Sequence, residues 1–284
     1  MLRSLFSGIS GLRAHQAMLD VSGNNIANAN TTGFKSSSTL FQDTLSQTLR
    51  GPASASTYNG GTNPVQMGLG VQVAATSTDF TQGSSQVTGR PTDMMIQGDG
   101  LFVVQKGSEQ LYTRAGAFTF DEAGDLVTPS GGRVQGYLVD AAGNPAGGLT
   151  TISLDPANAA PGVPGGVSMV SYDIGTDGIL RGIFSDGQQR NLGQLAIADF
   201  TNPMGLERVG ETAFRATANS GTPDLGVPGE GSRGSLMGGA LEMSNVDLSA
   251  EFTNLILAQR GFQANARVIT TADSVLETLV NIKR

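Results

Sequence analysis

The chain has 284 residues, a formal net charge of −7, 40 glycines and no cysteine. Because cysteine is absent, disulfide bonds, thiolate metal sites and a cysteine nucleophile are excluded. The acidic balance argues against binding to nucleic acid, which needs clustered Lys and Arg side chains. No apolar run reaches the roughly 18 residues that cross a bilayer, so we expect neither a nucleic-acid partner nor membrane insertion.

The first predicted element is a helix over about residues 2–28. Leu5, Leu12, Leu19 and Ile26 recur at every seventh position, and Ile9 belongs to a second row with the same spacing. A strict seven-residue apolar repeat is typical of helices that wind around one another. The sequence therefore predicts a coiled-coil helix at the start of the chain.

An Asn-rich segment follows this helix and contains Asn25, Asn28, Asn30, Gly33 and Phe34. Asn tolerates the left-handed backbone conformation and Gly adopts it freely, so the segment predicts a helix end followed by a turn. The amides either cap the helix or form hydrogen bonds across a contact between helices or subunits. Both interpretations are open at this point.

The middle of the chain is predicted to be a β-rich body over residues 68–218. Short apolar runs alternate with turn dipeptides such as Asp99-Gly100 and Asp177-Gly178, a pattern typical of antiparallel sandwiches and barrels. Residues 36–67 and 219–243 are rich in Ser, Thr, Gly or Pro, and we expect two extended linker arms there.

A second heptad pattern occupies the end of the chain, residues 244–284. We predict that this helix pairs with residues 1–35 as a discontinuous coiled-coil stalk, which makes the fold α+β with a central antiparallel β-rich body. A helix packed flat on the β body is the alternative. The predicted assembly seam consists of the apolar residues in the two heptad patterns: Leu5, Ile9, Leu12, Leu19, Ile26, Leu248, Phe252, Leu255, Phe262, Ile269 and Leu276.

Candidate catalytic groups are few. The only histidine, His15, lies in the first helix and is predicted to face away from the apolar rows, so a Ser-His-Asp site or a multi-histidine metal centre is not expected. Acidic residues such as Asp121 and Asp125 fall in predicted turns, where solvated carboxylates are ordinary. We therefore predict a protein that is not an enzyme and has no metal or cofactor.

Long motifs at both ends resemble the signatures of the bacterial flagellar rod and hook proteins. The first spans Ser4–Leu12 and Asn24–Lys35, and the second spans Glu242–Glu251 and Ala258–Arg267, where Asn245, Gln259 and Arg260 lie. Segments of the middle, such as Gln97–Phe102 and Leu192–Phe200, are similar as well. The resemblance covers nearly the whole chain.

Members of this family polymerise into hollow helical tubes, so the resemblance implies that the chain binds copies of itself. Within the family we expect a short hook-type subunit, a flexible joint that transmits torque. It would lack the outer domain that usually follows the segment matching Gln135–Tyr137, where only the Ala-, Gly- and Pro-rich residues 141–166 remain. A distal rod subunit is the alternative, and a secreted β-rich adhesin is a more distant one.

The resemblance also implies partners and a location. We expect contacts with the distal rod protein, the hook cap and the hook–filament junction proteins. Export would proceed through the flagellar type III apparatus without a cleaved signal peptide, to an extracellular place in the flagellar hook. The opening residues agree with this expectation, because Gly8, Ser10, Gly11 and Arg13 interrupt their apolar run.

Overall fold

The computed structural model describes residues 2–54, 60–140, 145–154 and 169–282. The chain forms two compact units. Unit 1 comprises residues 1–27, 36–79 and 246–284, and unit 2 comprises residues 28–35 and 80–245. Within the described ranges, no helix is both long enough and apolar enough to cross a membrane.

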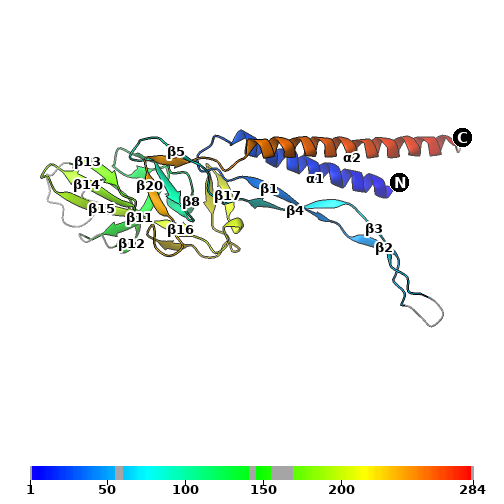
Figure 1. Ribbon diagram of the computed structural model, residues 1–284, viewed down its shortest axis with the longest axis horizontal. Coiled ribbons are helices and arrows are strands. Elements are labelled where there is room, and N and C mark those ends of the chain that lie inside the picture. The colour runs from blue at the N-terminus through cyan, green and yellow to red at the C-terminus, as the bar shows by residue number, and fades with distance from the viewer. Residues whose placement is uncertain (1, 55–59, 141–144, 155–168, 283–284) are drawn as a thin grey trace. The chain divides into compact units, whose positions relative to one another are not determined.

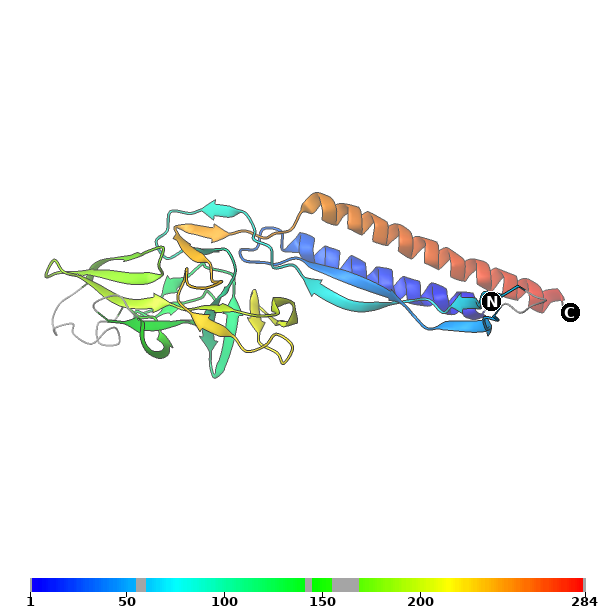
Figure 2. The same ribbon diagram turned by 60° about the horizontal axis from the view of Figure 1, so that its bottom comes forward.

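Unit 1 is built on two helices that lie side by side, α1 (Leu2–Ala27) and α2 (Leu248–Ile282), as Figures 1 and 2 show. They are antiparallel, since Gly8 lies against Ile269, Gly11 against Asn265 and His15 against Gly261. The carboxylate of Asp247 accepts hydrogen bonds from the free backbone N–H groups of Ser249 and Ala250, which caps the start of α2. The predicted pairing of the terminal helices is confirmed.

Four strands complete unit 1: β1 (Ser37–Asp43), β2 (Ser46–Arg50), β3 (Val65–Gly68) and β4 (Val71–Thr78). β1 pairs with β4 and β2 pairs with β3, both antiparallel, so residues 37–50 and 65–78 form a two-stranded ribbon. The ribbon runs beside α1, where the backbone N–H of Val71 donates to the Ser10 hydroxyl at 3.3 Å. Much of the segment predicted as the first arm is therefore paired β structure.

Unit 2 is β-rich, and its central sheet has the strand order β13-β14-β15-β11-β7-β8-β18-β17, with β9, β10, β12, β16 and β19 attached beside it. The strands β20 and β6 form a separate pair, as do β21 and β5, and all pairs of strands are antiparallel. The predicted antiparallel body is confirmed.

The bounds of these elements are β5 (Ser85–Val87), β6 (Met94–Gln97), β7 (Leu101–Lys106), β8 (Glu109–Thr113), β9 (Thr119–Phe120), β10 (Leu126–Val127), β11 (Arg133–Val139), β12 (Pro145–Thr151), β13 (Met169–Ile174), β14 (Ile179–Phe184), β15 (Gln189–Leu195), β16 (Ile197–Asp199), the short 3-10 helix η1 (Pro203–Gly205), β17 (Glu207–Gly210), β18 (Ala213–Arg215), β19 (Asp224–Gly226), β20 (Ser235–Gly238) and β21 (Ala240–Glu242).

The core of unit 2 is aromatic and aliphatic. Phe102 and Phe118 are fully buried and meet edge to face, with their ring centroids 5.1 Å apart. A second cluster forms around Tyr112 and Phe200, whose centroids are 4.8 Å apart. Burial of the Tyr112 side chain raises the pKa of its phenol. These two clusters hold the sheet together by apolar burial.

One segment differs from the expectation drawn from composition, and a second lies partly outside the described residues. Residues 219–243, predicted as the second arm, contain the short strands β19, β20 and β21 and belong to unit 2. Strands of three or four residues held by backbone hydrogen bonds leave almost no hydropathy pattern. The resemblance places the missing outer domain at residues 141–166. Only residues 145–154 of this segment are described, and they include β12. Residues 141–144 and 155–168 lie outside the described part.

Candidate assembly surface

The contact between α1 and α2 is made largely by small residues. A Cβ atom placed on Gly11 would lie 2.7 Å from the Asn265 amide, and one on Gly261 would lie 2.4 Å from the His15 ring. Ala14 and Ala258 are buried. Small residues let two helix backbones approach closely, so the large apolar side chains do not all lie in this contact.

His15 is therefore placed differently from the prediction. It was expected to face away from the apolar rows, but its ring lies against Gly261 in the helix contact and is only partly exposed. The physical reason is that Gly8, Gly11 and Gly261 bring the helices together on a face that the leucine spacing alone does not indicate. Its ring is also near Phe41 of β1, with a centroid distance of 6.4 Å.

Asn25 joins three elements of unit 1. The side chain is fully buried, and its amide N–H groups donate to the Ser37 carbonyl at 2.7 Å and to Glu251 Oε1 at 2.8 Å. Its amide oxygen accepts from the Ser37 N–H at 3.0 Å. This motif residue thus connects α1 to α2 and to β1. Of the two interpretations of the Asn side chains, Asn25 fits hydrogen bonding across a contact between helices.

The predicted seam residues divide into two groups. Leu5, Leu12, Leu19, Ile26, Leu255, Ile269 and Leu276 are partly buried within unit 1. The side chains of Ile9, Leu248, Phe252 and Phe262 are exposed, and Phe252 keeps 52% of its accessible surface. In a single copy the exposed group has no apolar cover.

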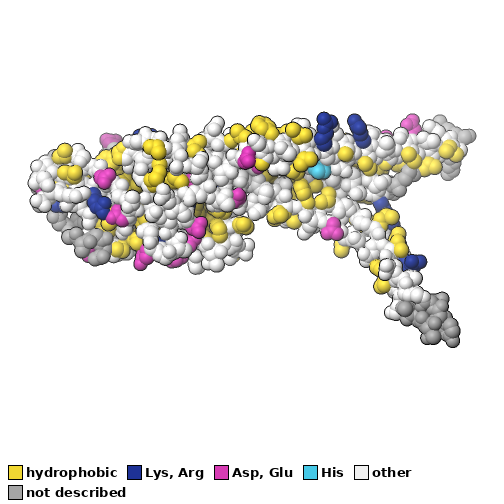
Figure 3. Space-filling view, in the orientation of Figure 1, with side chains coloured by type: hydrophobic (Ala, Val, Ile, Leu, Met, Phe, Trp, Pro, Cys, Tyr) yellow, Lys and Arg dark blue, Asp and Glu magenta, His cyan; other side chains and the backbone are white. Residues whose placement is uncertain are grey.

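A further apolar row on α2 was not predicted. Val268, Val275 and Ile282 also recur at every seventh position and are exposed, together with Leu257 and Leu279. The signal is present in the sequence but runs beside the stronger leucine row. Exposed apolar side chains consequently lie along both flanks of the α1 contact, and Figure 3 shows apolar side chains along the length of the helices.

The remaining motif residues lie in several environments. Asn28 accepts through its side-chain oxygen from the Thr31 hydroxyl at 3.1 Å, and Asn245 donates to the Thr81 carbonyl at 3.2 Å. Asn30, Gln259 and Arg260 are exposed. The structure therefore brings only part of the motif together.

Unit 2 contains a buried group of charges, Lys35, Arg114 and Glu242, which we name the clasp. The Glu242 carboxylate accepts from Lys35 Nζ at 2.7 Å and from Arg114 Nε at 2.5 Å, and all three side chains are at most 4% exposed. Burial favours a raised pKa for Glu242, but the charge of Arg114 and the hydrogen bonds from Lys35, Arg114 and the Gly83 N–H outweigh it, so the pKa is lowered.

Gly33 and Phe34 lead into the clasp. The Gly33 N–H donates to the Glu242 carbonyl at 2.8 Å, and the buried Phe34 ring lies 5.0 Å from the Arg208 guanidinium carbon. Burial lowers the pKa of Arg208. These contacts fix residues 33–35 against the body of unit 2, so the motif serves packing there.

Replacing Gly33 with Ala should lower the free energy of unfolding by roughly 2 to 4 kcal/mol. Gly33 has φ +68°, and an added Cβ would lie 2.4 Å from the Ala115 backbone nitrogen. Gly187→Ala is the matched control, because φ is +76° there but nothing lies within 4 Å. Urea unfolding of both variants checks this, and equal losses would contradict a steric role for Ala115.

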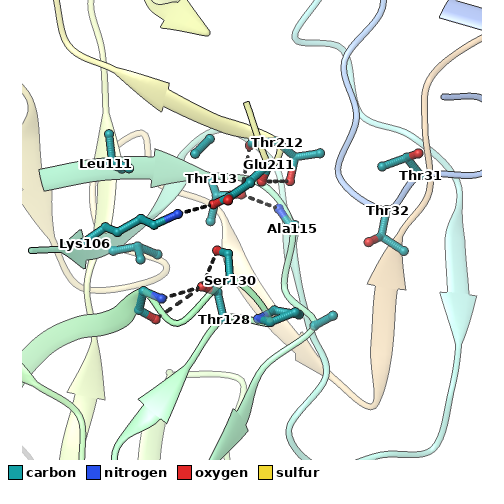
Figure 4. Close-up of a pocket in the computed structure, with 15 residues that line it drawn as sticks. Thr31, Thr32, Lys106, Leu111, Thr113, Ala115, Thr128, Ser130, Glu211 and Thr212 are labelled. Carbon is teal, nitrogen blue, oxygen red and sulfur yellow. Dashed lines mark hydrogen bonds and ion pairs between the residues drawn. The ribbon is translucent and has the colours of Figure 1, made fainter. Parts of the chain in front are cut away.

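Unit 2 also has a cavity of about 390 Å³, shown in Figure 4. Its walls are mostly apolar, and the ion pair between Lys106 and Glu211, with 2.6 Å between Nζ and Oε2, crosses one side. Glu211 and Thr212 have φ near +55°, which is unusual for residues with a side chain. Thr31 of the Asn-rich motif lines the opposite side.

The cavity offers little chemistry. Its polar groups are hydroxyls and one ion pair, an arrangement that does not assemble an acid, a base and a nucleophile. In the part of the chain that the structure describes, no three His, Cys, Asp or Glu side chains are grouped as metal ligands. The exposed apolar rows of unit 1 are the stronger candidate for a functional surface.

Three family models match the chain. One described as flagella basal body rod protein matches residues 5–35, and one described as flagellar hook protein FlgE/F/G D1 domain matches residues 95–182. The third, described as flagellar basal body rod FlgEFG protein C-terminal, matches residues 237–282. The matches cover both terminal motifs and part of the β body.

Whole proteins are similar as well. A protein of Bacillus subtilis named flagellar basal-body rod protein FlgG is 44% identical over 285 residues, which covers all of both chains. Two proteins of Borreliella burgdorferi also align over all of both chains: its rod protein FlgG at 35% identity over 288 residues, and its flagellar hook protein FlgE at 30% over 441. The chain therefore belongs to the flagellar rod and hook protein family.

Proposed function

We propose that the chain polymerises with copies of itself into a tube of the flagellar rod, and that the exposed apolar rows of unit 1 bind neighbouring copies. Proteins of this family are structural and form part of the flagellum, so the chain is a structural subunit and not an enzyme. From the sequence alone we expected a hook-type subunit. We now take a rod subunit as the first candidate and the hook-type subunit as the second.

The observation that carries self-association is the exposure of α2. Ten large apolar side chains of this helix are exposed in a single copy: Leu248, Phe252, Ile256, Leu257, Phe262, Val268, Val275, Leu279, Val280 and Ile282. A surface of this kind marks an interaction site, because it costs free energy to leave it in water.

Charge supports the same surface. Unit 1 carries seven basic and seven acidic side chains, so the whole formal charge of −7 belongs to unit 2. Copies of unit 1 can pack together without net electrostatic repulsion. The predicted seam residues Leu255 and Phe262 lie on this neutral unit.

Length supports the rod. Rod relatives align over lengths close to that of the chain, for example 285 residues in Bacillus subtilis and 287 in Caulobacter vibrioides. The hook relatives of Borreliella burgdorferi and Treponema pallidum need alignments of 441 and 463 positions. The chain thus has the size of the rod relatives and lacks the additional length of the hook relatives.

A hook-type subunit is the second candidate. It is favoured by the match of residues 95–182 to the FlgE/F/G D1 model and by hook relatives that align with the whole chain. Contacts with the distal rod protein, the hook cap and the hook–filament junction proteins, and an extracellular place, belong to this candidate. For both the rod and the hook-type subunit, we propose export through the type III apparatus without a cleaved signal peptide.

Electron microscopy of the concentrated, purified full-length protein tests the proposal and separates the two candidates. Straight tubes are expected from a rod subunit. Curved tubes would favour the hook-type subunit, and a protein that stays monomeric at all concentrations, with or without sheared flagellar basal bodies as seeds, would contradict self-association. An adhesin would give this last result.

A further inference from the structure

The end of α2 extends beyond α1. Gly8 lies against Ile269 in the antiparallel pair, so Leu2 is level with about Val275 and the last turns of α2 continue past the start of α1. Figure 1 shows this overhang. Val275, Leu279, Val280 and Ile282 are exposed there, with Ile282 at 75%. We name residues 275–282 the overhang.

Unit 1 also has an apolar groove, on the side of α1 that faces the ribbon. The groove has a volume of about 550 Å³ and lies between the first turns of α1 and residues 69–73 at the start of β4. Phe6, Ile9, Leu69 and Val73 line it and are themselves exposed, with Phe6 at 67%. Nothing in the described part of the chain fills this space.

The geometry points to the overhang of a second copy as the occupant of this groove. The overhang of the same copy is ruled out, because α2 is one continuous helix and its end runs away from the groove, past the start of α1. The contact would be head to tail, since groove and overhang are different surfaces, and such contacts generate open helical polymers when the rotation between copies does not close a ring. The inference rests on the proposed function and names the surfaces through which copies meet.

Charge complements the apolar fit. Arg13 stands in the wall of the groove and is exposed, and Glu277 is the acidic residue of the overhang and is exposed too. A carboxylate on the apolar helix end and a guanidinium in the wall of the apolar groove allow one ion pair in the contact. Lys283 and Arg284 follow the overhang in the sequence, so the pairing concerns Glu277 itself and not the net charge of the helix end.

Disulfide trapping in polymers tests the contact, and the chain is suited to it because it has no cysteine of its own. Val73→Cys and Leu279→Cys place single thiols on the groove and on the overhang, both at exposed positions. The two variants are mixed in equal amounts, polymerised, and oxidised with copper–phenanthroline. A disulfide needs Cα atoms within about 7 Å, so only adjacent surfaces can be joined.

We expect a dimer joined between positions 73 and 279 in polymers of the mixture, and none in the unassembled mixture. Val73→Cys mixed with Val268→Cys is the matched control and should give no dimer. Polymers that form but lack the link between positions 73 and 279, or that join 73 to 268 instead, would overturn this contact and leave the proposed self-assembly intact. Absence of polymers from the unsubstituted chain would overturn both.

Charge reversal gives an independent readout. Arg13→Glu should raise the critical concentration for polymerisation about tenfold, because it places Glu277 beside a like charge. Glu277→Arg alone should do the same, and the double variant should return to within about threefold of the parent. Additive losses in the double variant would overturn the pairing of these two residues.

Discussion

Replacing Glu242 with Ala should lower the free energy of unfolding by about 3 to 5 kcal/mol, the effect expected when one partner of a buried ion pair is removed. The change removes the carboxylate that Lys35 and Arg114 share, and both side chains stay buried. Carbonyl partners such as Thr81 for Lys35 at 2.7 Å and Ile96 for Arg114 at 3.0 Å would remain. Urea unfolding followed by far-ultraviolet circular dichroism measures the loss.

Two control variants separate charge from packing. Glu242→Gln keeps the shape and one acceptor oxygen, so its loss should fall between those of the parent and the Ala variant. Glu211→Ala breaks the exposed ion pair with Lys106 and should hardly move the midpoint, because water screens that pair. If Glu242→Ala unfolded within 1 kcal/mol of the parent, the clasp would have no net role in stability.

The clasp also predicts how stability changes with pH. Since the pKa of Glu242 is lowered from its ordinary value of 4.5, the folded protein binds this proton less readily than the unfolded chain. The contribution of Glu242 is therefore complete above about pH 5 and is lost as the pH falls through the lowered pKa. The parent should lose stability in this acid range, and Glu242→Gln should lose less over the same range.

The double variant Leu255→Asp, Phe262→Asp should abolish polymerisation and leave unit 2 folded. Phe262 is exposed on α2, and Leu255 is partly buried. Burying two carboxylates in an apolar contact between copies costs several kcal/mol, and each 1.4 kcal/mol is a tenfold change in affinity. Sedimentation of polymers and electron microscopy should show at least a tenfold loss of assembled protein.

A matched pair of substitutions controls for added charge. Gln263→Asp and Thr270→Asp place the same two carboxylates at exposed polar positions of the same helix. This variant should assemble within about threefold of the parent, because no apolar contact is lost. Normal tubes from the Leu255 and Phe262 variant would show that these side chains do not bind neighbouring copies.

Much of the fold could be predicted because the heptad rows and the alternation of strands with turns are local signals. The face on which α1 and α2 meet could not, since Gly8, Gly11 and Gly261 contribute no apolar side chain to a hydropathy pattern. The clasp was equally hidden. Lys35 and Glu242 are 207 positions apart, and only the folded sheet brings them within 2.7 Å.

The candidate surface could also be predicted only in part. The leucine rows predicted which helices have an apolar face, but only the folded structure shows which of these side chains remain exposed and can contact a neighbouring copy. Ile9 and Phe252 are exposed, whereas Ile269 and Leu276 are partly used within the copy. The row through Val268 and Val275 was missed because two seven-residue repeats overlap on one helix.

The clasp has a mechanical consequence for a subunit that carries load. It joins Lys35, the last residue before the chain leaves unit 2 for β1, to Glu242, three residues before the chain leaves unit 2 for α2. Tension applied through these two of the four crossing segments would pass between them through the hydrogen bond from Lys35 to Glu242 and the backbone bond from Gly33. The strands of the central sheet are not part of this direct path, so they would carry less of the load when the polymer is pulled or twisted.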